Sequence, residues 1–166
     1  MKTLLKIIAL MLISNVAYSQ CKYTVDEVDK FTQYHVLETK GKVLWMNISG
    51  AVGVIGKKVD DLKVLKIYIS GHGIFSILEG QELDLLTTTG EVHTLTSIEN
   101  VTADYHVIGG STVWMGTIAY YAEDYDKMIG VNYETIRIHV TGNGFIEREI
   151  KAKYQDNISK VLECIK

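Results

Sequence analysis

The pattern that most restricts the fold of this chain is the alternation of apolar and polar residues over short segments. In residues 65–70, Leu65, Ile67 and Ile69 alternate with Lys66 and Tyr68. A period of two places the apolar side chains on one face of a β-strand. The same reasoning predicts strands over residues 42–49, 65–70, 82–88, 91–96, 111–121, 135–141 and 145–150.

The 166 residues include 14 glycines and no proline. Glycine and asparagine are therefore the residues expected in the turns between these segments. Thr89-Gly90 predicts a hairpin between residues 82–88 and 91–96. Gly142-Asn143-Gly144 predicts a second hairpin, since both residue types readily adopt a positive φ. No proline-rich or serine-rich linker interrupts the pattern, so we expect a single domain over residues 20–166.

Three segments predict helical structure. Residues 22–32 carry capping-box spacing at Thr24 and Glu27, and residues 123–129 begin with acidic residues, which suit a helix N-terminus. The clearest pattern lies in residues 154–165, where apolar side chains recur at helical intervals: Tyr154, Ile158, Val161, Leu162 and Ile165. The predicted class is α+β, with a mostly antiparallel sheet covered by a C-terminal amphipathic helix. A small barrel or half-barrel with the same helix is the alternative.

The N-terminus has the features of a secretory signal peptide. Lys2 and Lys6 precede an apolar run over residues 7–13, and Ala17-Tyr18-Ser19 forms a small-x-small cleavage site. The run is too short to span a bilayer, which needs about 20 residues. We therefore expect residues 1–19 to be removed and the protein to be periplasmic or extracellular, with no membrane span.

The two cysteines lie near the two ends of the predicted mature chain. Gln20 precedes Cys21, where a lipoprotein needs a small residue, so no lipid anchor is expected. In an oxidising compartment, Cys21 and Cys164 are candidates for one disulfide, with two free thiols as the alternative.

Charge restricts the partners. The whole chain has a net charge of −3, and removal of residues 1–19, which hold two lysines and no acidic residue, lowers it to −5. Nucleic acids and anionic membranes are bound through clustered lysine and arginine, so neither is an expected partner.

Two windows of the chain share short motifs. Residues 34–73 and residues 105–144 each begin with Tyr-His-Val, continue through Trp-Met and end in a glycine turn. The windows indicate either a duplicated strand unit or the coincidences that β-rich sequences produce. Duplication would place Trp45 and Trp114 at equivalent positions.

No known catalytic or metal-binding motif appears in the sequence. The five histidines lack zinc-type spacing to each other or to cysteine, and the acidic clusters lack EF-hand spacing. We assign no catalytic residue, metal or cofactor from sequence. The candidate surface for a small ligand or protein partner is the strand over 111–121, where Trp114, Ile118 and Tyr120 share one face. A core position under the C-terminal helix is the alternative for these side chains.

Loose motifs across most of the mature chain resemble a group of small exported proteins of the Bacteroidota type. They are Cys21-Lys22-Tyr23 with the following Asp26-Glu27-Val28-Asp29, the hairpin at Thr89-Gly90, the Ile136-Arg137-Ile138 strand, the closing helix and the mature Gln20 terminus. The resemblance implies export and an α+β fold, and it carries no activity.

Three function hypotheses follow. The first is an exported, non-catalytic protein that binds a ligand or partner or has a structural role. The second is a small secreted hydrolase, which requires at least two of the following groups to meet in a cleft: His35, His93, Asp104, His106 and Glu123. The third is a secreted protein inhibitor, which requires an exposed aromatic patch around Trp114 and Tyr120.

Overall fold

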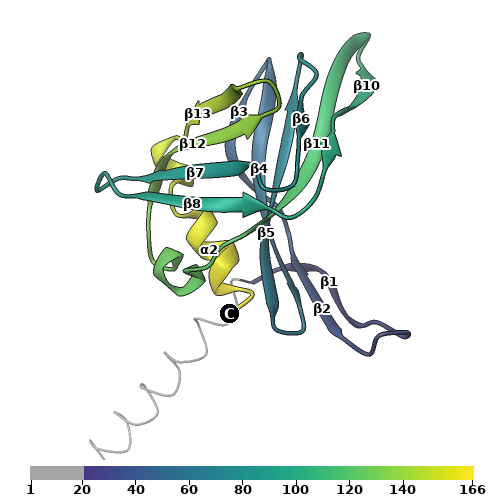
Figure 1. Ribbon diagram of the computed structural model, residues 1–166, viewed down its shortest axis with the longest axis vertical. Helices are drawn as coiled ribbons and strands as arrows, with labels where there is room; N and C mark the ends of the chain where they lie inside the picture. The colour runs from purple at the N-terminus through teal and green to yellow at the C-terminus, as the bar shows by residue number, and fades with distance from the viewer. Residues whose placement is uncertain (1–20) are drawn as a thin grey trace, which may run out of the picture.

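The computed structural model describes residues 21–166 (Figure 1). The predicted signal peptide, its cleavage site and Gln20 lie outside the described residues. None of the helices in residues 21–166 combines the length and the hydrophobicity that crossing a bilayer demands.

The fold is a mostly antiparallel sheet with one short C-terminal helix packed on it, as predicted. The elements in chain order are β1 (Tyr23–Val28), β2 (His35–Thr39), β3 (Lys42–Asn47), β4 (Gly50–Val59), β5 (Leu62–Gly71), β6 (Ser76–Ile77), β7 (Glu82–Thr87), β8 (Val92–Ser97), β9 (Val101–Thr102), β10 (Asp104–Ile108), β11 (Ser111–Tyr121), the 3₁₀ turn η2 (Tyr125–Met128), β12 (Tyr133–Val140), β13 (Gly144–Glu149), the 3₁₀ turn η3 (Ala152–Tyr154) and α2 (Asn157–Glu163).

The main sheet has the strand order β1-β2-β4-β5-β11-β8-β7-β12-β13, with β3 attached to β4 and β10 to β11. In Figure 1 the strands β7, β8, β12 and β13 run across the long strands β4 and β5 at a steep angle. The strands at the two ends of the order, β1 and β13, do not pair with each other, so the sheet stays open. The closed-barrel form of the alternative is therefore wrong.

The predicted hairpins form as expected. β7 and β8 are joined through Gly90 at φ 89°, and β12 and β13 are joined through Gly142 and Asn143 at φ 87° and 61°. In β5 the alternation is also confirmed, because Leu65, Ile67 and Ile69 are all buried.

β4 is the central strand that the alternation pattern did not predict. Its apolar residues are interrupted by Gly53 and Gly56, and glycine weakens a strand signal. Gly56 has a packing role: a Cβ atom built on it would lie 2.8 Å from the carbonyl oxygen of Val161 in α2. The helix thus approaches the sheet where a side chain is missing.

Two of the three helical predictions need correction. The helical turn predicted over residues 22–32 is wrong, because residues Tyr23–Val28 form β1 and pair with β2. Thr24 Oγ donates to the carbonyl of Glu38 at 3.2 Å and caps no helix. Residues 123–129 contain only the 3₁₀ turn η2.

The C-terminal helix is present but shorter than predicted. Of the predicted range 154–165, the helix α2 covers residues 157–163, and Tyr154 ends the 3₁₀ turn η3. Ile158, Val161, Leu162 and Ile165 are buried, so the apolar stripe does face the sheet.

A disulfide joins Cys21 to Cys164, as predicted, with their Cα atoms 5.5 Å apart. Next to it, the Tyr23 hydroxyl donates to the carbonyl of Cys164 at 2.8 Å. The beginning of β1 is therefore held to the end of α2 by a covalent bond and a hydrogen bond.

The two windows with shared motifs have different strand pairings. In residues 34–73, β2 and β3 both pair with β4, whereas in residues 105–144 β10 pairs directly with β11. Trp45 lies under the guanidinium of Arg148, and Trp114 lies against Tyr105. The structure thus gives the two tryptophans no equivalent positions.

Candidate functional site

The three side chains of β11 that were candidates for a binding surface are buried or half-buried. Ile118 and Tyr120 are each 0% exposed and belong to the hydrophobic core, and Trp114 is half-buried against that core. These side chains contribute to folding, because β11 lies between β5 and β8 and its inner face is covered.

Three of the five groups that the hydrolase hypothesis names are exposed and line none of the described pockets. His35 pairs with Asp26 on the exposed β1–β2 hairpin, with 2.8 Å between His35 Nε2 and Asp26 Oδ1. Asp104 and His106 are exposed on β10. The remaining two groups, His93 and Glu123, line the same cleft.

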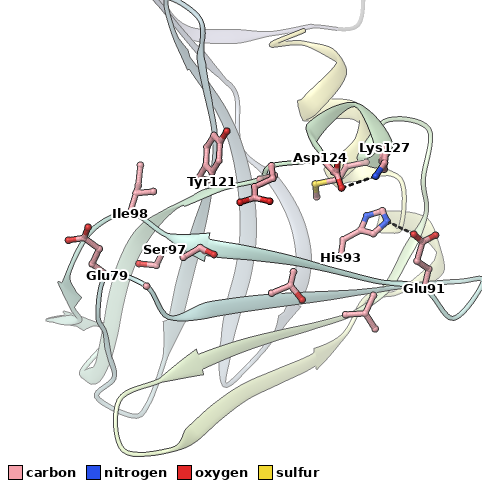
Figure 2. A pocket seen from close by; sticks show the side chains of 15 residues that line it. Glu79, Glu91, His93, Ser97, Ile98, Tyr121, Asp124 and Lys127 are labelled. Atoms are coloured by element: carbon pink, nitrogen blue, oxygen red, sulfur yellow. Dashed lines mark hydrogen bonds and ion pairs between the residues drawn. The ribbon is translucent and has the colours of Figure 1, made fainter.

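The cleft lies between β8 and the segment that follows β11 (Figure 2). Its volume is about 710 Å³. Pairing explains its position: β11 pairs with β8 only at Thr96 and Ser97, and the chain then leaves β8 after Tyr121. The lining side chains that carry charge or hydrogen-bonding groups are Glu79, Glu91, His93, Thr94, Thr96, Ser97, Tyr121, Glu123, Asp124 and Lys127.

His93 lies at the inner end of the cleft, between Tyr133 and Glu91. Its Nδ1 is 2.8 Å from the Tyr133 hydroxyl, and its Nε2 is 3.4 Å from Glu91 Oε1. The Tyr133 hydroxyl is the hydrogen-bond partner of Nδ1, whereas Glu91 lies only at ion-pair distance from Nε2. Burial raises the pKa of Tyr133, so its hydroxyl keeps its proton well above neutral pH.

The charge of the cleft is strongly negative. Four carboxylates line it, from Glu79, Glu91, Glu123 and Asp124, and Lys127 is the ammonium group among the lining residues. Lys127 Nζ lies 2.8 Å from Asp124 Oδ2, and this hydrogen bond raises the pKa of Lys127. The two charges offset each other, so the other three carboxylates determine the potential in the cleft.

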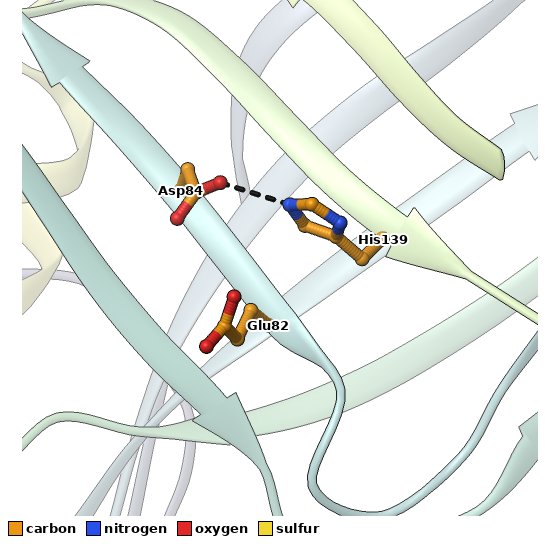
Figure 3. A group of neighbouring side chains, drawn as sticks. All are labelled: Glu82, Asp84 and His139. Carbon is orange, nitrogen blue, oxygen red and sulfur yellow. Dashed lines mark hydrogen bonds and ion pairs between the residues drawn. The ribbon is translucent and has the colours of Figure 1, made fainter. Parts of the chain in front are cut away.

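A second group of side chains has donor atoms that are close enough to share a metal ion (Figure 3). The donor atoms of Glu82, Asp84 and His139 all lie within 4.8 Å of one another on the solvent side of β7 and β12. His139 Nε2 donates to Asp84 Oδ2 at 2.9 Å, and Thr94 Oγ1 donates to Asp84 Oδ1 at 2.8 Å. Both oxygens of Asp84 thus have protein donors, and these hydrogen bonds account for the arrangement without an ion.

Sequence reasoning names His93 and Glu123 as candidates and notes Asp124 in an acidic cluster, but it does not connect the other residues of the cleft with them. Glu79, Glu91 and Lys127 carry no motif, because their meeting depends on where β11 separates from β8. The acidic start of residues 123–129 is the one local signal for this site, and its pattern is equally typical of a helix start.

No protein-family model, curated protein or solved structure matches this chain. The functional argument therefore rests on the geometry of the cleft.

Proposed function

We propose that this protein is an exported binding protein and that its cleft beside β8 takes a cationic ligand. The observation that carries the proposal is the excess of carboxylates around one hollow of about 710 Å³. In a concave site, field lines from charges of one sign are concentrated, which favours a ligand of opposite charge.

Export is supported by two independent features. The N-terminal sequence has the order of a signal peptide, and the Cys21–Cys164 disulfide suits an oxidising compartment. Production from the full-length gene in a bacterium with a periplasm tests this location. We expect a periplasmic or secreted product that begins at Gln20, and a cytoplasmic product that keeps residues 1–19 would refute it.

Binding is favoured over hydrolysis by the state of His93. The hydrolase hypothesis is supported by the meeting of His93 and Glu123 in one cleft. However, Nδ1 of His93 is hydrogen-bonded to the Tyr133 hydroxyl, and the His93 side chain is only 13% exposed. A general base must reach the proton that it removes, and burial of the ring limits that access. The inhibitor hypothesis loses its aromatic patch, because Tyr120 is buried.

The binding proposal is tested with spermidine, a trivalent amine, by isothermal titration calorimetry. The variant Glu91→Gln/Glu123→Gln removes two cleft charges and keeps the side-chain size. We expect it to weaken binding by about tenfold or more, since two nearby charges contribute at least about 1.4 kcal/mol. The matched control is Glu27→Gln/Asp61→Asn, which removes two exposed carboxylates from elsewhere on the surface.

The control variant should bind spermidine within about twofold of the wild type, and added salt should weaken binding to both proteins. Equal losses in the two variants would show that only the net charge of the protein matters. That result, or no binding by the wild type, would overturn the proposal.

A further inference from the structure

The edge of β8 that faces the cleft has unpaired backbone groups. β8 pairs with β7 from Val92 to Thr96, but on its other side β11 pairs with Thr96 and Ser97 alone. Residues 92–95 therefore lack a neighbouring strand on the cleft side. Within residues 21–166, no loop provides a backbone partner there.

The register shows which backbone groups point into the cleft. On the β7 side, Ser97 N donates to Gln81 O and Thr87 N donates to Glu91 O, each at 2.8–2.9 Å. In an antiparallel ladder, hydrogen-bonding direction alternates along the strand. The N–H and C=O groups of Val92 and Thr94 consequently point away from β7, toward the cleft.

The edge stays open because the segment that follows β11 is hydrogen-bonded to α2 and not to β8. Met128 is buried, the Tyr125 hydroxyl donates to the carbonyl of Leu162, and Gly130 N donates to Ser159 Oγ at 2.6 Å. Figure 2 shows this segment, with Asp124 and Lys127, lying apart from β8 across the cleft. The backbone that would otherwise continue β11 along β8 is thus held elsewhere.

From this geometry we infer that the ligand is an extended basic peptide, which adds to β8 as a strand along the path that β11 leaves. This inference rests on the proposed function and specifies its ligand. Four residues of edge extend about 13 Å, at about 3.3 Å per residue, which suits a peptide of four to six residues. The backbone groups of Val92 and Thr94 pair with the peptide, and the carboxylates of Glu79, Glu91 and Glu123 attract its lysine or arginine side chains.

Charged groups beside a free strand edge normally prevent pairing with other chains. Here the charges around the cleft are nearly all negative, so they repel an acidic strand and favour a basic one. The same groups therefore protect the edge and select its ligand.

The test uses a fluorescein-labelled hexapeptide of alternating lysine and threonine, measured by fluorescence anisotropy. One derivative carries N-methyl groups on alternate residues, and a second carries them on the other residues. Methylation removes backbone donors and leaves the charge unchanged. A peptide strand directs alternate N–H groups to its partner, so one derivative should bind at least about tenfold more weakly than the other.

Protein variants test the same contact from the other side. Val92→Pro removes a donor that points to the cleft and that β7 does not use, and Val92→Ala keeps this donor. We expect Val92→Pro to weaken peptide binding by about tenfold or more, and Val92→Ala to change it by less than about twofold. Circular dichroism and the spermidine titration check that Val92→Pro stays folded with its charged cleft intact.

The outcomes separate the two proposals. If spermidine binds and neither methylation nor Val92→Pro affects the peptide, strand addition is refuted and the cationic cleft stands. If neither spermidine nor the peptide binds, both proposals fail. A peptide of alternating glutamate and threonine that binds as well as the lysine peptide would refute the charge selection.

Discussion

Replacement of Gly56 by alanine tests how α2 is seated on the sheet. An alanine Cβ would lie 2.8 Å from the carbonyl oxygen of Val161 and 3.2 Å from Ile165 Cδ1. The Ile165 side chain can rotate away, but the Val161 oxygen belongs to the backbone of the helix. The helix must therefore move outward, and this movement separates the buried side chains of Ile158 and Leu162 from the core.

The expected cost follows from two opposing effects. Overpacking of a close contact costs about 1–3 kcal/mol, whereas loss of glycine flexibility in the unfolded chain stabilises by about 0.4–1 kcal/mol. We therefore expect Gly56→Ala to lower the free energy of unfolding by about 1–2 kcal/mol. Urea denaturation followed by circular dichroism measures this change.

The matched control is Gly73→Ala. A Cβ atom on Gly73 meets no other atom within 4 Å, and its φ is outside the left-handed region. The control variant should be as stable as the wild type or slightly more stable. A Gly56→Ala protein with the wild-type urea midpoint would refute the packing argument.

Three further predictions concern the ends of the chain and the buried tyrosines. Replacement of Cys21 and Cys164 together by serine should lower the free energy of unfolding by up to about 5 kcal/mol, because their disulfide closes a loop of nearly the whole domain. A loss of less than about 1 kcal/mol in urea denaturation without reductant would contradict this. Tyr133→Phe should lower the free energy of unfolding by about 1–2 kcal/mol, because His93 Nδ1 loses its hydrogen-bond partner. Tyr120→Phe should leave stability unchanged or raise it, since the Tyr120 hydroxyl is buried with no partner among residues 21–166. Equal urea midpoints for the two variants would oppose this reasoning. Burial raises the pKa values of Tyr120, Tyr125 and Tyr133 above the usual 10.0. The stability from their burial is therefore complete below pH 10 and falls above it, because the unfolded chain releases those protons first. Phenolate absorbance should show tyrosines that ionise at higher pH in the folded than in the denatured protein, and superimposable titrations would be inconsistent with this.

Local patterns in the sequence were sufficient to predict the elements whose side chains alternate or repeat regularly. The strand around Leu65, Ile67 and Ile69, the turn at Gly142-Asn143-Gly144 and the buried stripe of α2 are all of this kind. Such elements are predictable because neighbours in the chain define which face is apolar and which turn is possible. The disulfide was also inferred from sequence, as one of two alternatives.

Other features depend on contacts between residues far apart in the chain. The spacing of Thr24 and Glu27 suggests a helix cap, but pairing with β2 makes this segment a strand. Gly56 weakens the pattern of β4, and its role appears only when α2 lies against it. Whether the Tyr120 face of β11 is surface or core was likewise decided by what covers it.

The sequence by itself determined an α+β fold, the main hairpins, the helix stripe and the two cysteines as a possible pair. Only the tertiary structure decided where the cleft lies, because that position depends on the point at which β11 leaves β8. This point is set by the attachment of the segment after Tyr121 to α2, through residues more than 25 positions away in the chain. A local pattern contains no information about such a contact, and so nothing in the sequence connects Glu79 and Glu91 with the acidic pair Glu123 and Asp124.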